Sequence, residues 1–62
     1  MAKKILRIHV VIQRTGLSRT AIYEMMRKGL FPQSVKISTR SVGWREEDID
    51  SWINGLGVIK ND

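Results

Sequence analysis

The sequence of 62 residues predicts a small, mainly α-helical domain with one β-hairpin, in the order helix, tight turn, helix, hairpin, helix. Apolar residues recur at helical spacing in three segments, and a short alternating stretch lies between the second and the third. Single glycines follow the first two helical segments, where helices commonly end. We expect one domain over residues 1–62, ordered from about 6 to 56 and frayed at both ends.

The first helix is expected at residues 9–15. Ile8, Val11 and Ile12 fall at positions i, i+3 and i+4, so they line one helical face. Gly16 stands where a residue in the left-handed conformation would end the helix. A short turn should therefore separate this helix from the next.

The second helix is expected at residues 19–28. Ser18 is a good N-cap, because its hydroxyl can accept a hydrogen bond from an otherwise unpaired backbone N–H. Gly29 should end the helix, and Pro32 should prevent it from resuming. The residues expected to face the core are Ile22, Met25 and Met26.

Residues 35–37 alternate apolar, polar, apolar, as in a half-buried strand, and residues 42–44 could return antiparallel to them. Because a two-stranded hairpin is marginal alone, it must pack on the helices. The side chains expected to do so are Val35, Ile37 and Trp44. Lys36 should then point away from the core.

The last helix carries one apolar stripe at i, i+3, i+4 and i+7, formed by Ile49, Trp52, Ile53 and Leu56. Its first turn holds Glu46, Glu47 and Asp48, where the positive end of the helix dipole favours acids. Gly55 or Gly57 should end it, followed by a loose tail at residues 58–62. Together these elements predict a winged helix-turn-helix.

Charge is distributed unevenly along the chain. Residues 1–45 hold ten Lys or Arg and one acid, whereas residues 46–62 hold five acids and one base, so +9 and −4 sum to the net +5. A basic segment of this kind favours a polyanion, either nucleic acid or an anionic membrane surface. No apolar run approaches the ~20 residues of a membrane span. We expect a cytoplasmic protein without a membrane partner.

Catalytic and metal-binding residue types are scarce. The chain has no cysteine and one histidine, and five of its six acids follow residue 45. No nucleophile with a positioned base can be assembled from this set, nor a cluster of metal ligands. We expect no enzyme activity, no metal and no cofactor.

The second helix carries the candidate DNA-reading residues. Arg19, Tyr23 and Arg27 fall on one stripe, with Thr20 and Glu24 beside it. An α-helix fits the major groove, where Arg can pair with guanine and Glu can accept from cytosine. With the hairpin added, the candidate DNA contacts are Ser18, Arg19, Thr20, Tyr23, Glu24, Arg27, Lys28, Lys36, Thr39 and Arg40.

Other interpretations remain open at this point. The second helix could be an ordinary amphipathic helix with solvated charges, in which Glu24 and Lys28 form an i,i+4 pair. The chain could also be a small adaptor that binds a protein partner through its acidic last helix or its methionines. RNA binding is less favoured, because Tyr23 is the single aromatic residue expected to be free for stacking.

Two runs carry a family resemblance, TGLSRTAIYEMMRKGLFP at residues 15–32 and VKISTRSVGWREEDIDSWI at residues 35–53. They resemble the AlpA family of prophage regulators, small winged-helix proteins related to phage excisionases and to MerR-type DNA-binding domains. The resemblance covers roughly residues 6–56. It implies double-stranded DNA binding by the second helix and the hairpin wing, and regulation of prophage or genomic-island genes.

The related excisionases imply an alternative, a recombination directionality factor that bends attachment-site DNA. A phage integrase or RNA polymerase would be the protein partner. The small surface favours a monomer in solution, with cooperative binding on DNA. Activator, repressor and excisionase share the helix and wing, so sequence alone does not separate them.

Overall fold

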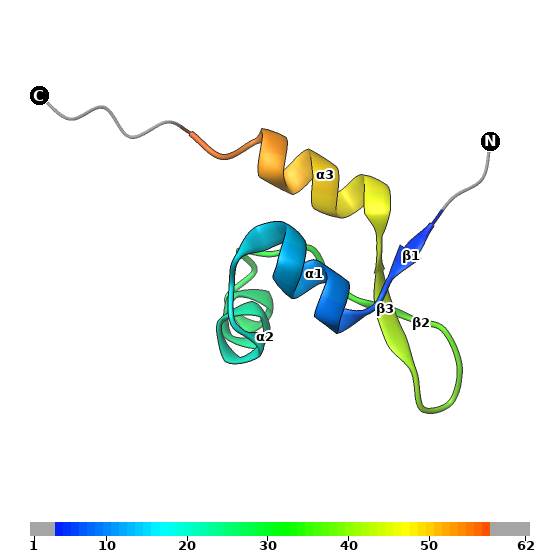
Figure 1. The fold of residues 1–62 in the computed structure, drawn as a ribbon. Helices are drawn as coiled ribbons and strands as arrows, with labels where there is room; N and C mark the ends of the chain where they lie inside the picture. Colours follow the sequence, from blue (N-terminus) through cyan, green and yellow to red (C-terminus); the bar gives the residue numbers. More distant parts are fainter. Residues whose placement is uncertain (1–3, 58–62) are drawn as a thin grey trace, which may run out of the picture.

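The computed structural model describes residues 4–57, so most of the frayed ends expected before residue 6 and after residue 56, namely residues 1–3 and 58–62, lie outside the described residues. Two helices and the turn between them are preceded by a short strand and followed by a hairpin and a third helix (Figure 1). The elements are β1 (Ile5–Leu6), α1 (Ile8–Thr15), α2 (Arg19–Arg27), β2 (Val35–Lys36), β3 (Val42–Arg45) and α3 (Glu46–Asn54). The predicted mainly α-helical fold with a small hairpin is confirmed, with one strand more than expected.

The turn between α1 and α2 is closed by hydrogen bonds at the end of α1. Helix α1 begins one residue before its predicted start and ends as expected at Thr15. The N–H of Gly16 donates to the carbonyl oxygen of Ile12 (2.8 Å). The hydroxyl of Thr15 donates to the carbonyl oxygen of Val11 (2.8 Å) and accepts from the N–H of Leu17 (3.2 Å). The chain therefore leaves α1 in a defined direction.

Both ends of α2 are capped as predicted. The hydroxyl of Ser18 accepts from the N–H of Ala21 (3.1 Å). At the other end Gly29 has a φ of 74°, a left-handed conformation that costs glycine little. The N–H of Leu30 then reaches back to the carbonyl oxygen of Met25 (2.8 Å), as in a Schellman motif. The helix ends one residue before the predicted position.

The sheet has three antiparallel strands in the order β1-β3-β2, so the predicted hairpin of β2 and β3 is present and a third strand, β1, joins it. Strand β1 pairs with β3, with Ile5 opposite Arg45 and Leu6 opposite Trp44. The backbone pairing continues past the strand, since the N–H of Glu46 donates to the carbonyl oxygen of Lys4 (2.9 Å). Strand β3 is thus paired along both edges, with β1 on one edge and β2 on the other.

Two faces of the sheet can be distinguished by the register. Side chains alternate along a strand, and directly opposite residues share a face. Leu6 and Trp44 are opposite each other and buried, so they define the inner face. Val42 lies two residues before Trp44 and opposite Lys36, which places both on the inner face. Lys36 is exposed, as expected for a residue outside the core, but the register places it on the face of Trp44 and not on the opposite face.

Of the three apolar residues expected to pack on the helices, Trp44 lies buried on the inner face, whereas Val35 and Ile37 lie on the outer face. Val35 lies opposite Gly43, on the face away from Trp44. A Cβ placed on Gly43 would come within 2.6 Å of Ile5 Cγ2 and 3.0 Å of Ile37 Cδ1. Val35 is half-buried and lines one pocket with Ser51 and Trp52 of α3. Ile37 follows β2 and is 47% exposed, so its predicted packing on the helices is wrong. Its alternation with Val35 is confirmed, but the Ile37 side chain reaches towards Gly43 instead.

The core lies between the inner face of the sheet and the helices, and its buried residues are Leu6, Val11, Ile22, Phe31, Trp44 and Ile49. Met25 and Met26 are half-buried against it, as predicted. Leu56 lies beyond the end of α3 and is 54% exposed, so its predicted place in the apolar stripe is wrong. None of the helices in the described part of the chain has the length and apolar character that crossing a membrane requires.

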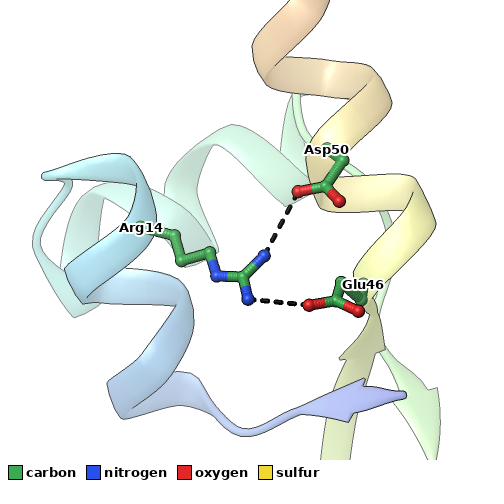
Figure 2. Close-up of polar contacts among 3 residues, drawn as sticks. All are labelled: Arg14, Glu46 and Asp50. Atoms are coloured by element: carbon green, nitrogen blue, oxygen red, sulfur yellow. Dashed lines mark hydrogen bonds and ion pairs between the residues drawn. The ribbon is translucent and has the colours of Figure 1, made fainter.

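Helices α1 and α3 are joined by a charged contact at the surface (Figure 2). The guanidinium of Arg14 lies 2.7 Å from Glu46 Oε2 and 3.2 Å from Asp50 Oδ1. The predicted acidic first turn of α3 is confirmed. Its Glu46 therefore has a second structural role, since it also binds a cation of α1.

Candidate nucleic-acid interface

One face of α2 is exposed and polar. Its side chains line a single open depression, formed by Arg19, Thr20, Tyr23, Glu24 and Arg27. The opposite face packs on the core through buried Ile22. The structure thus brings together the five α2 residues that helical spacing placed on or beside one stripe.

An ion pair lies within this face. Arg27 Nη2 pairs with Glu24 Oε1, one turn apart at i,i+3. The sequence had indicated Lys28 as the i,i+4 partner of Glu24, and the structure corrects this. Lys28 instead follows the last residue of α2 and is exposed. Ser18 sits at the other end, where its hydroxyl caps the helix.

Tyr23 links the exposed face of α2 to the sheet. Its ring centroid lies 6.3 Å from that of Trp44, with an interplanar angle of 54°. Tyr23 keeps 42% of its surface exposed, whereas Trp44 is fully buried. The indole Nε1–H of Trp44 donates to the carbonyl oxygen of Pro32 (2.9 Å), in the segment after α2. Trp44 therefore contacts both α2 and the chain that leaves it.

The wing is the loop between β2 and β3 together with these strands. The N–H groups of Ile37 and Ser38 donate to the carbonyl oxygen of Ser41 (2.8 and 3.2 Å), which closes the loop. Thr39 and Arg40 lie exposed in this loop. In Figure 1 the loop extends away from the three helices. Its position gives the wing a contact surface distinct from that of α2.

Lys36 is the candidate wing residue that shares a face of the sheet with Trp44. It lies on the inner face of the sheet, which also carries Trp44. The ring of Trp44 packs near that of Tyr23 on α2. The candidate residues of α2 and Lys36 therefore lie on the same side of the sheet. Thr39 and Arg40 lie further out, in the loop.

The surroundings of Val42 and Arg14 do not follow from the sequence analysis. Val42 is 40% exposed and lies beside Lys36 on the inner face, which its two-residue spacing from Trp44 could have indicated. Arg14 was counted within the basic half, but Glu46 and Asp50 bind its guanidinium. No local pattern shows an ion pair between residues more than thirty positions apart.

This surface has few side chains of the kinds that bind a metal ion or a cofactor. Among residues 4–57, no group of three or more His, Cys, Asp or Glu side chains lies close enough together to hold a metal ion. The polar groups of α2 and the wing are mainly hydrogen-bond donors and cations. Such a set suits an extended anionic ligand.

The family model of the prophage CP4-57 regulatory protein (AlpA) matches residues 4–55 of this chain. The chain is 38% identical over 53 residues to the uncharacterized protein ORF88 of Enterobacteria phage P4, covering 86% of this chain and 60% of that protein. It is 37% identical over 59 residues to the DNA-binding transcriptional activator AlpA of Escherichia coli K12, covering 86% of this chain and 84% of that protein. No solved structure matches it. The extent of the family match shows that this chain belongs to the family of the prophage CP4-57 regulatory protein AlpA.

Proposed function

We propose that this chain is a sequence-specific, double-stranded-DNA-binding transcriptional regulator. The observation that carries the proposal is the exposed α2 face with Arg19, Tyr23 and Arg27. Tyr23 packs near Trp44, which lies on the same face of the sheet as Lys36. An α-helix of this kind fits the major groove, and a basic wing beside it suits the neighbouring backbone or minor groove. Membership of the AlpA family, whose E. coli relative is named a DNA-binding transcriptional activator, supports it.

The position of each residue along α2 suggests its role. Residues at the N-terminal end of a recognition helix usually reach base edges, so Arg19, Thr20 and Tyr23 would read the sequence. Arg27 and Lys28 lie towards the C-terminal end, nearer the phosphates. Phosphate contacts set the orientation of the protein on the duplex, while base contacts specify the site.

The remaining candidates would support these contacts. Ser18 holds the first turn of α2 in place through its cap and can still donate its hydroxyl hydrogen to a phosphate. Lys36, Thr39 and Arg40 would contact the backbone from the wing, with Arg40 able to enter a narrow minor groove. None of these roles requires a catalytic group, a metal or a cofactor.

A footprint on the DNA that flanks its own gene, at roughly physiological salt, tests the proposal. We expect protection of short sites that are repeated, because a single small domain buries little surface and gains specificity by binding several sites. Sites at a promoter would indicate a regulator. Sites at an attachment sequence would favour the alternative of an excisionase that bends DNA and acts with an integrase.

Arg19→Ala tests the contact surface directly. Loss of a bidentate guanine contact should cost about 1–3 kcal/mol, which is roughly 5- to 150-fold in affinity, and relax the preference at one base pair. Arg45→Ala is the matched control, since Arg45 is exposed and lies on the outer face of the sheet. Equal losses for both variants, or none for Arg19→Ala, would contradict the proposed surface.

Salt dependence separates this function from that of a protein-binding adaptor. Four cations on the proposed phosphate-contacting surface, Arg27, Lys28, Lys36 and Arg40, predict a slope of log K against log salt of about −3.6. An adaptor that uses α3 would show no salt-sensitive affinity for duplex DNA. A slope near zero would therefore refute the proposal.

A further inference from the structure

Glu24 is an anomaly on a surface that would approach a polyanion. It is the one acid among the first 45 residues, and it lies within the α2 face beside Arg19, Thr20, Tyr23 and Arg27. A carboxylate in this position repels phosphates wherever the protein binds, so it lowers affinity for DNA of any sequence. Its presence there needs an explanation other than affinity.

We propose that Glu24 is a specificity-determining residue, which restrains Arg27 on non-cognate DNA and releases it at a site that presents a cytosine to Glu24 and a guanine to Arg27. This inference rests on the proposed function, because it concerns the same surface. It adds a role for the ion pair, names the bases that the pair would recognise, and gives Arg27 a guanine instead of a phosphate at the cognate site.

The geometry of the ion pair supports the restraint. Glu24 Oε1 and Arg27 Nη2 are paired on adjacent turns of α2, and the two side chains are 45% and 72% exposed. Both groups are therefore accessible to a groove and are already in contact before DNA arrives. If Arg27 turns to a phosphate, Glu24 loses its partner in the negative potential of the duplex.

A cognate site removes this penalty. The major-groove edge of cytosine presents an amino donor that a carboxylate accepts, and the edge of guanine presents two acceptors for an Arg. One C·G pair, or two adjacent pairs, could satisfy both side chains at once. The carboxylate thus lowers the affinity for the cognate site less than the affinity for other sequences. Specificity is the difference between these two binding free energies.

Glu24→Gln tests the idea, because it removes the charge while keeping the shape of the side chain. Because the Glu24–Arg27 ion pair is lost, Arg27 becomes free to contact phosphates, and affinity for random duplex DNA should rise by about 2- to 5-fold, the range for an exposed ion pair. Discrimination against replacement of the cytosine should fall by at least about 5-fold, the lower limit for one good base contact. Both are measured by titrating a footprinted site, its single-base variants and a random duplex.

Asp48→Asn is the matched control. It changes the net charge by the same amount, but it lies on α3 beside Arg45, outside the α2 face. It should raise the affinity for all duplexes by one common factor and leave discrimination unchanged. Thermal unfolding of both variants, followed by circular dichroism, establishes that each is folded at the temperature of the titration.

A double variant tests whether Glu24 acts through Arg27. In an Arg27→Gln background the partner is absent, so Glu24→Gln should raise random-duplex affinity by less than in the wild type. If Glu24→Gln behaves like Asp48→Asn at every duplex, the inference is wrong, while the proposed function stands. If the wild-type protein itself does not discriminate between duplexes, the proposed function fails and the inference fails with it.

Discussion

Gly43→Ala is predicted to destabilise the fold by overpacking the centre of the sheet. Gly43 lies in the central strand β3, and a Cβ there would be 2.6 Å from Ile5 Cγ2 and 2.8 Å from the carbonyl oxygen of Leu6. The Ile5 side chain can rotate, but the Leu6 oxygen belongs to the backbone of β1. Strand β1 must therefore shift away from β3.

The cost follows from these distances. Overpacking of this kind typically costs about 1–3 kcal/mol. A domain of this length has a total stability of about 3–9 kcal/mol. A loss near 2 kcal/mol would lower the Tm by roughly 8–16 °C, because each kcal/mol is worth about 4–8 °C in a domain of this size. Thermal unfolding followed by circular dichroism measures this shift.

Gly55→Ala provides a control with the opposite expected sign. Gly55 has a right-handed helical backbone with φ −84°, and the nearest contact of an added Cβ would be 3.4 Å, to the carbonyl oxygen of Ser51. Replacing a glycine at a compatible position stabilises by about 0.4–1 kcal/mol. Adding Ile5→Ala to Gly43→Ala should not restore stability, since the Leu6 oxygen remains. An unchanged Tm for Gly43→Ala would refute this account of the sheet.

Three further predictions concern the charged and capping residues. Lys36→Gln should make the salt slope of DNA binding less steep by about 0.9, whereas Arg45→Gln on the outer face should leave it unchanged; equal effects would contradict the assignment of the two faces. Arg14→Met should lower stability by about 0.5–1 kcal/mol at low salt, a small value because the three charges are partly exposed, and the loss should shrink at high salt in denaturant titrations. Ser18→Ala should lower the free energy of unfolding by about 1 kcal/mol, because the N-cap hydrogen bond is lost, and should weaken DNA binding in the same samples. DNA binding at wild-type strength would show that the cap supports the fold but not the contact surface.

The helices could be predicted because their signals are local. Ser18 caps α2 with its own side chain, and Gly29 ends it with its own backbone conformation. The relative directions of Arg19, Tyr23 and Arg27 follow from helix geometry alone, so the exposed α2 face was also predictable. These features need only residues within a few positions of one another.

The third strand could not be predicted in this way. Strand β1 is two residues long, which is too short to show a period, and its partner Trp44 is 38 positions from Leu6. Without β1, the alternation of residues 35–37 gave no information about which side faces the core. A period of two defines two faces, but only packing decides which one is buried. Lys36 was therefore assigned to the wrong face.

The face on which Lys36 lies decides whether the wing and α2 can contact one duplex. With Lys36 on the outer face, the wing and α2 would present their charges to different sides of the sheet. With Lys36 on the inner face, its charge lies on the side of Trp44, where Tyr23 packs. One duplex could then contact both elements, as the proposed function requires.

Trp44 is the side chain on which this common surface depends. It is buried, it lies opposite Leu6 in the sheet, it bonds to Pro32 after α2, and its ring packs near Tyr23. Trp44 therefore helps to fix α2 relative to β3, together with Ile22, Met25 and Met26, which pack in or against the same core. A domain of this size buries only about 60% of its unfolded surface, so few contacts are available for this purpose. Holding two contact elements at a set spacing before binding reduces the entropy lost on DNA. A small core can therefore support a recognition surface larger than any one of its elements.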